Sequence, residues 1–312
     1  MNSFTVAVNA IIPITAVMIL GFAARKKGIV SETSLNDFNK VVFRCCLPLS
    51  LFESIIQIDS SSIANPLLIG YCMVFLCLII GMGILVLHRS SMSKAKKGVF
   101  VQALFRSNFV ILGLPIVESI YGRENVGITS VMVALLVPFL NVAAVLILQI
   151  YSGKKINLKS TLEALIKNPM IIGAVLGLIG VSCGFSMPSL GSAVLASITK
   201  MTTPLALFVL GGTFQFHTLA ENRFLLTGLT FLRLILIPAL GLAGAVLLSF
   251  RGVELISMLV LFGGPVAVAS YPMAQQMGLD GEFAAQAVLV TTLLVLGTLF
   301  MFITGLGTFN LI

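Results

Sequence analysis

The sequence predicts an all-α polytopic membrane protein with ten transmembrane helices, arranged as two inverted repeats of five. Three features lead to this prediction: an apolar composition, a motif repeated at half the chain length, and two apolar segments interrupted by glycine and proline. Of the 312 residues, 58% are hydrophobic and 10% are charged, and the mean hydropathy is +1.11. A water-soluble domain of this composition would expose large apolar patches. We therefore expect most of the chain to lie within a bilayer.

The repeated motif centres on a proline within an apolar run. Residues 44–52 read RCCLPLSLF and residues 200–208 read KMTTPLALF, 156 positions later. Both copies place a basic residue four positions before the proline. Two halves that carry prolines at corresponding depths in apolar segments are typical of membrane proteins built from internal repeats.

Ten segments are long enough to span a bilayer core of about 30 Å, which takes about 20 apolar residues of helix. They cover residues 4–24, 33–57, 66–87, 97–121, 126–150, 169–186, 190–215, 224–249, 253–277 and 282–306. The longest connection, residues 152–168, is predicted to be a cytoplasmic linker between a first repeat at 1–151 and a second at 169–312.

The distribution of positive charge predicts the orientation. Twelve Lys and Arg residues fall in the connections after spans 1, 3, 5 and 7, and two in those after spans 2, 4, 6 and 8. Cytoplasmic loops carry the excess of Lys and Arg, so both termini are expected outside. Five spans per repeat is an odd number, so the second repeat would enter the membrane from the opposite side. We expect a multi-pass protein of the plasma membrane, the bacterial inner membrane.

The fourth and ninth spans each combine glycine, proline and polar residues near the middle of the bilayer. Proline removes an N–H group, and glycine lets the chain leave helical geometry. Freed backbone groups are tolerated at this depth only where they face protein or a water-filled cavity. We interpret the two spans as broken helices that cross and form a binding site, with simple kinks as the alternative. The residues expected to shape the breaks are Gly113, Pro115, Gly264, Pro265 and Pro272.

The residues around these breaks favour an anionic ligand. Each break would expose a helix N-terminus, whose free N–H groups and dipole attract negative charge. Asn108 and Ser270 could orient a carboxylate, and Arg106 could supply positive charge. The apolar spans hold four cations, Arg44, Arg106, Lys200 and Arg233, against the two carboxylates of Glu53 and Glu118. Arg44 and Lys200 would attract the anion from opposite sides, unless both side chains extend to the nearest membrane interface.

Five segments in the same order resemble the auxin efflux carrier family in its bacterial permease form. They are FNKVVFRCCLPLSLF (38–52), RSNFVILGLPIVESIYG (106–122), VPFLNVAAVLIL (137–148), GPVAVASYPMAQQMG (264–278) and VLVTTLLVLGTL (288–299). The resemblance implies a fold related to the bile acid sodium symporters. Spans 1, 2, 6 and 7 would form a scaffold, often dimeric, and the others a core that carries substrate by an elevator-like motion. It also implies organic anions as substrates, auxin in plants and dicarboxylates in bacteria.

The resemblance assigns Asn108 as the asparagine of the crossover. Many relatives have a second asparagine where this chain has Ala269. Residues 263–277 contain no Asp or Glu to hold sodium, although Gln275 and Gln276 could offer neutral oxygens. Together with Asn141, these two glutamines are candidates for polar support of the site.

The function expected from these features is secondary transport of a small organic anion, such as an auxin-like carboxylate or a malate-type dicarboxylate. Sodium-coupled symport is the alternative, followed by a channel or receptor. The two histidines lie at loop edges, and HExxH and phosphate-loop motifs are absent, so we do not expect an enzyme. The expected partners are the bilayer, the anion and, from the resemblance, a second copy of the chain. Proton coupling is left open, and no cofactor, metal or nucleic acid is expected.

Overall fold

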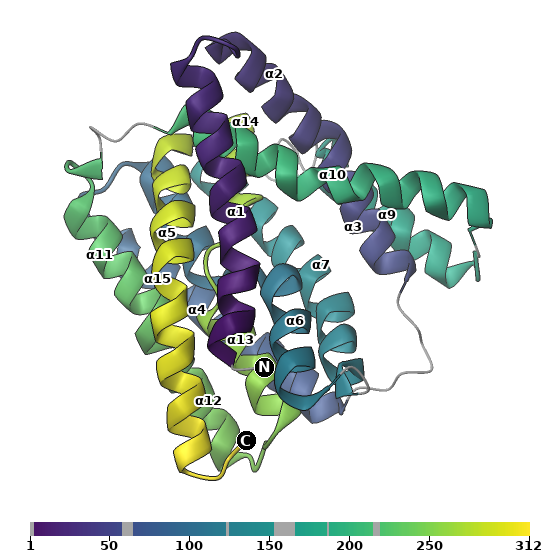
Figure 1. The fold of residues 1–312 in the computed structure, drawn as a ribbon, viewed down its shortest axis with the longest axis vertical. Helices are drawn as coiled ribbons and strands as arrows, with labels where there is room; N and C mark the ends of the chain where they lie inside the picture. Colours follow the sequence, from purple (N-terminus) through teal and green to yellow (C-terminus); the bar gives the residue numbers. More distant parts are fainter. Residues whose placement is uncertain (1–2, 58–64, 123–124, 153–165, 186, 215–218) are drawn as a thin grey trace.

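The computed structural model describes residues 3–57, 65–122, 125–152, 166–185, 187–214 and 219–312, and its regular elements in these ranges are helices (Figure 1). Within these described ranges, five helical stretches are long and apolar enough to cross a membrane. They are α4 (Pro66–His88), α7 (Gly127–Tyr151), α10 (Ser189–Thr213), residues 223–247 and α15 (Gly281–Thr308). The protein is therefore an all-helical, polytopic membrane protein.

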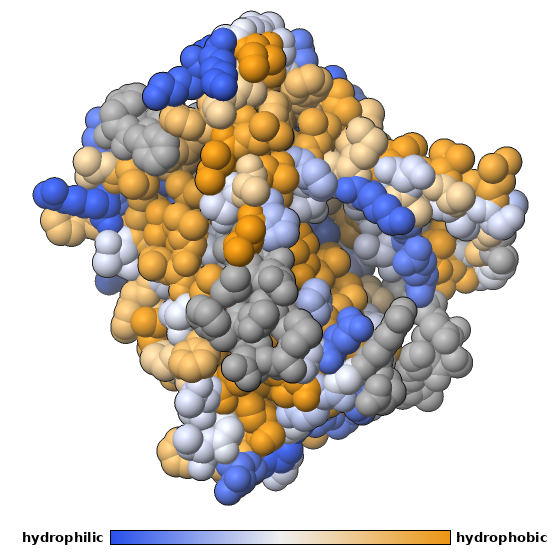
Figure 2. Space-filling model, viewed as in Figure 1, coloured by the Kyte–Doolittle hydropathy of each residue, from blue (hydrophilic) through white to orange (hydrophobic). Residues whose placement is uncertain are grey.

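The molecular surface supports this class. Large apolar side chains are exposed on separate helices, for example Leu85 on α4 and Leu240 on α12 (Ile237–Leu247). Figure 2 shows hydrophobic residues over much of the left and upper right of one face, with hydrophilic residues at its upper left, at its lower end and beside a hollow on the right. A surface of this kind is stable against lipid chains and not against water.

The other helices lie within the predicted spans or join them. They are α1 (Ser3–Lys26), α2 (Glu32–Val41), η1 (Val42–Cys46), α3 (Leu47–Ile56), α5 (Lys94–Phe105), α6 (Phe109–Tyr121), α9 (Pro169–Ser182), α11 (Arg223–Phe231), η4 (Leu232–Leu236), α13 (Val253–Gly263) and α14 (Ser270–Gln276). Of these, α11 and η4 form the first part of the stretch 223–247. Most of the predicted linker, residues 153–165, lies outside the described residues.

Two short π-helical turns each precede a proline. In η1 the Leu47 N–H donates to the carbonyl of Val42, just before Pro48. In η4 the Ile237 N–H donates to Leu232, just before Pro238. Proline cannot donate, and a wider turn shifts the helical bonding around it.

The second copy of the repeated motif has a different backbone. Pro204 lies within the uninterrupted α-helix α10, whereas Pro48 in the first copy follows a π-helical turn. The two copies therefore share their sequence pattern and not their local conformation.

Close backbone contacts join the helices that the sequence assigns to the scaffold. A Cβ atom at Gly21 of α1 would lie 2.0 Å from the carbonyl oxygen of Phe208, and one at Gly211 of α10 would lie 2.0 Å from that of Met18. Gly173 lets α9 approach α3 in the same way. Glycine permits this distance, as is common between membrane helices. Figure 1 shows α2, α3, α9 and α10 grouped together, with α1 crossing α10.

Candidate functional site

The two predicted helix breaks lie side by side and pair with each other. Helix α5 ends at Phe105 and α6 begins at Phe109, while α13 ends at Gly263 and α14 begins at Ser270. The Asn108 N–H donates to the carbonyl of Pro265 at 2.9 Å, and the Ala267 N–H donates to that of Arg106 at 3.1 Å. These bonds form an antiparallel bridge between Ser107 and Val266. Each break thereby satisfies backbone groups of the other, as the bilayer interior requires.

Close contact at this crossover depends on Gly264. A Cβ atom there would lie 2.5 Å from the carbonyl oxygen of Val260 and 2.6 Å from Oγ of Ser107. The Ser107 hydroxyl donates to the same Val260 carbonyl at 3.1 Å. Any larger residue would have to push the two breaks apart.

The first break differs from the prediction in its position. Gly113 and Pro115 were expected to shape it, but both lie inside the continuous helix α6. A proline within a helix frees one carbonyl without ending the helix, and a Cβ at Gly113 would meet the ring of Phe109 at 2.9 Å. The break falls instead at Arg106, Ser107 and Asn108. The signal for it in the sequence is three consecutive polar residues within an apolar run.

The second break contains Gly264 and Pro265, as the prediction placed them. Pro272 is the third residue of α14. The N–H groups in the first turn of a helix have no intrahelical partner, so a proline there removes no helical hydrogen bond. It therefore follows the break and does not form part of it.

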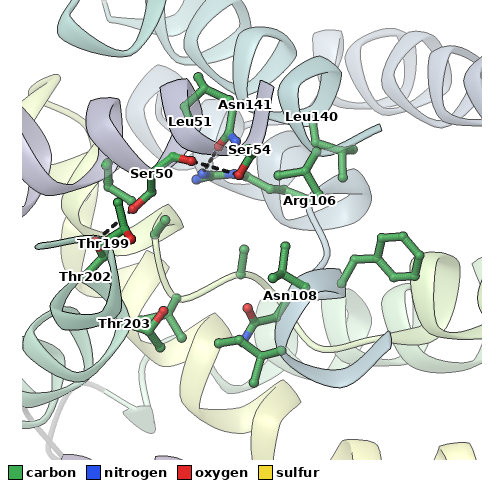
Figure 3. Close-up of a pocket in the computed structure, with 18 of the residues that line it drawn as sticks. Ser50, Leu51, Ser54, Arg106, Asn108, Leu140, Asn141, Thr199, Thr202 and Thr203 are labelled. Carbon is green, nitrogen blue, oxygen red and sulfur yellow. Dashed lines mark hydrogen bonds between the residues drawn. The ribbon is translucent and has the colours of Figure 1, made fainter. Parts of the chain in front are cut away.

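A cavity of about 310 Å³ opens beside the crossover. Its walls come from α3, the first break and the start of α6, α7, α10 and the second break (Figure 3). The polar residues that line it are Ser50, Glu53, Ser54, Arg106, Ser107, Asn108, Asn141, Thr199, Lys200, Thr202 and Thr203. Figure 3 shows Arg106 and Asn141 together near Ser54, and Asn108 facing the side of Thr203.

Arg106 and Asn108 are two buried donors on the wall of this cavity. Their exposed fractions are 3% and 8%. Nη2 of Arg106 donates to Oδ1 of Asn141, but among the described residues neither Nη1 of Arg106 nor Nδ2 of Asn108 has a hydrogen-bond partner. Burying an unpaired donor is unfavourable, so both nitrogen atoms are suited to bind an acceptor from a ligand.

The backbone adds to the positive potential at the same place. Residues 109–111, the first turn of α6, line the cavity. The N–H groups of a first helical turn have no intrahelical partner and carry the positive end of the helix dipole. Glu53 is the one carboxylate among the described residues that line the cavity, and Lys200 adds a further cation. The arrangement therefore suits an acceptor-rich, negatively charged ligand.

Three predicted residues lie away from this cavity. Ser270 is 1% exposed, its hydroxyl has no partner among the described residues, and it does not line the cavity. Gln275 accepts a hydrogen bond from Nδ2 of Asn39 and donates one to Oδ1 of Asn36 at 3.2 Å, which links α14 to α2. Gln276 is half-buried and also outside the cavity lining.

The two predicted anion-attracting residues differ in their surroundings. Lys200 is exposed and lines the cavity, whereas Arg44 is exposed and does not line it. The motif copies that carry them nevertheless meet, because Thr202 donates to the carbonyl of Cys46, 156 residues earlier, at 3.4 Å. The Ser50 and Thr202 hydroxyl groups also lie 2.9 Å apart.

Paired breaks beside a polar cavity, in a polytopic helical chain, are features of membrane transporters. The chain belongs to the membrane transport protein family, whose model matches residues 6–303, and this confirms the resemblance to the auxin efflux carriers. It is 23% identical over 296 residues to an uncharacterised transporter of Methanocaldococcus jannaschii, covering 92% of this chain and 94% of that protein. It is 26% identical over 269 residues to the uncharacterised transporter YfdV of Escherichia coli, covering 83% and 84%.

Proposed function

We propose that this membrane transport protein is a secondary carrier of a small organic anion, which binds in the cavity beside the crossover. The observation that carries the proposal is a pair of buried donors on its wall, Nη1 of Arg106 and Nδ2 of Asn108, which have no hydrogen-bond partner in the described part of the chain. A carboxylate would satisfy both and would lie at the positive end of α6.

The dimensions of the cavity favour a small substrate. At about 310 Å³ it lies at the lower end of the usual range for small-molecule sites, roughly 300 to 1,000 Å³. A malate-type dicarboxylate or an indole carboxylate is of suitable size. In this proposal Lys200 attracts the anion at the edge of the cavity, and Asn141 holds Arg106 in place.

The internal contacts support an inverted repeat with an elevator-like cycle. Both the motif copies and the two breaks meet their counterparts from the other half, at Cys46 with Thr202 and at Ser107 with Val266. The cavity lies between α3 and α10, which we assign to the scaffold, and the breaks with α7, which we assign to the moving core. Sliding of the core against the scaffold would carry the anion across, with both termini outside and a second copy joined through the scaffold.

Uptake into proteoliposomes tests the function. Radiolabelled malate and indole-3-acetate are supplied to purified protein with and without imposed proton, sodium and voltage gradients. We expect saturable uptake of at least one of them. Absence of saturable uptake of either, by protein shown to be folded, would contradict the proposal for these two substrate types.

Replacement of one donor tests the site. Asn108→Ala removes an amide that contacts the anion in a buried setting, so uptake at low substrate concentration should fall about tenfold or more. Asn125→Ala is the matched control, because Asn125 is exposed and its side-chain amide donates to the carbonyl of Tyr121, away from the cavity lining. Equal uptake by the two variants would remove Asn108 from the binding site.

A further inference from the structure

Arg233 is the largest fully buried side chain of the described residues, and it lies behind the crossover, outside the cavity lining. Its guanidinium group donates to three backbone carbonyls. Nε bonds to Gly264 at 3.0 Å, Nη1 to Leu104 at 2.8 Å and Nη2 to Leu261 at 3.2 Å. The two salt bridges found among the described residues do not include Arg233. A full positive charge is therefore held in the protein interior by carbonyl oxygens.

These carbonyls share one origin, the C-terminal ends of the two broken helices. Leu104 lies in the last turn of α5, and Leu261 lies in the last turn of α13. Gly264 is the residue that directly follows the end of α13. Carbonyls at a helix C-terminus have no intrahelical donor and carry the negative end of the dipole. Two such ends that converge in a low-dielectric interior repel each other, and each unpaired carbonyl there is unfavourable. The guanidinium group donates to these carbonyls, and its positive charge offsets the repulsion between the two negative helix ends.

The bonded carbonyls adjoin the residues that form the site. Leu104 lies two positions before Arg106, and Gly264 precedes Pro265, whose carbonyl accepts the Asn108 N–H. The positive end of α6 therefore faces the cavity, whereas the negative ends of α5 and α13 face Arg233.

We propose that Arg233 is a positioning residue that acts as a built-in cation of the crossover. It ties the end of α5 to the end of α13, and so sets how Arg106 and Asn108 are presented to the cavity. Its planar fork of donors can reach several carbonyls in fixed directions, which the single nitrogen of lysine cannot do. Because these carbonyls already hold a cation, the crossover needs no dissociable sodium ion at this point.

Thermal unfolding of the full-length protein in detergent tests the positioning role without any substrate. Arg233→Met keeps an unbranched apolar stem and removes the charge, and we expect its Tm to fall by about 5 °C or more. Arg223→Met is the matched control, because Arg223 is exposed and lies over the ring of Phe224. We expect its Tm to stay within about 2 °C of the wild type. Equal shifts in the two variants would overturn the proposal.

Addition of guanidinium chloride at low millimolar concentration separates this role from a loss of packing. The ion fits the vacated carbonyls, so it should restore much of the Tm of Arg233→Met and leave that of Arg223→Met unchanged. Tetramethylammonium chloride, which cannot donate hydrogen bonds, should not restore it. If guanidinium and tetramethylammonium chloride have the same effect on the Tm of Arg233→Met, the proposal that Arg233 is a built-in cation is contradicted.

Arg233→Lys keeps the proposal testable if the methionine variant does not fold. Its Tm should lie clearly below that of the wild type, because lysine retains the charge and loses the planar arrangement of donors. A Tm equal to that of the wild type would overturn the role of the guanidinium geometry.

The inference that no sodium ion is needed at the crossover rests on the proposed carrier function and is tested separately. Uptake by wild-type protein should persist when choline replaces sodium, whereas loss of uptake would overturn that inference and leave the thermal results intact.

Discussion

Gly264 should be among the least replaceable residues of the crossover, and Gly264→Ala isolates the reason. The backbone of Gly264 has φ −65° and ψ 158°, a conformation open to alanine. Any loss of stability must therefore come from the added methyl group and not from the conformational freedom of glycine. That methyl group would lie 2.5 Å from the carbonyl oxygen of Val260 and 2.6 Å from Oγ of Ser107.

The expected magnitude follows from two terms. Forcing an extra methyl group into a packed interior costs about 1 to 3 kcal/mol. Displacing the Ser107 hydroxyl from the Val260 carbonyl removes a hydrogen bond worth about 0.5 to 1.5 kcal/mol. We therefore expect Gly264→Ala to lower the free energy of unfolding by about 2 to 4 kcal/mol.

Reversible unfolding in mixed micelles with sodium dodecyl sulfate measures this difference. Gly81→Ala in α4 is the matched control, because a Cβ atom there would meet no atom within 4 Å. Alanine is favoured over glycine inside a helix, so this control should be stabilised by about 0.5 to 1 kcal/mol. If Gly264→Ala unfolds at the same detergent fraction as Gly81→Ala, close approach at the crossover does not constrain residue 264.

Two further predictions concern the edge of the cavity and the contact between α4 and α12. Lys200→Gln should raise the apparent half-saturation concentration for uptake about threefold or more, whereas Arg44→Gln should leave it unchanged, because only Lys200 lines the cavity; equal effects in uptake assays would contradict this difference. Tyr71→Phe should lower the free energy of unfolding by about 1 kcal/mol, since the Tyr71 hydroxyl donates to the carbonyl of Gly241. A variant as stable as the wild type in the same micelle assay would show that this bond contributes nothing.

The membrane class and much of the second break could be predicted from the sequence, because both depend on local properties. The length of an apolar run sets whether a helix can cross the bilayer. Gly264 and Pro265 are adjacent in the chain, and each weakens helical geometry where it stands.

The first break could be placed only approximately, because tertiary contacts decide it. Residues 106–108 contain neither glycine nor proline, and their extended form depends on backbone bonds to residues 265 and 267. The glycine and proline of this span, Gly113 and Pro115, stay within helix α6. Ser270 was expected at the site for its hydroxyl, but it is buried outside the cavity lining. Tertiary packing decides which residues of a helix face a cavity, and this is not encoded locally.

Arg233 shows where the symmetry of the two halves ends. The position 156 residues earlier is Cys77, which is exposed on the continuous helix α4. Arg233 instead is the second residue of the π-helical turn η4. The wider geometry of this turn places its side chains differently from those of a regular helix. Both negative helix ends converge on one point, so a single guanidinium group serves both. A second cation about 5 Å away would add a repulsion of about 3 kcal/mol at an effective dielectric constant of about 20. A crossover built from two similar halves is therefore best neutralised by one residue from one half, and sequence symmetry alone would not reveal it.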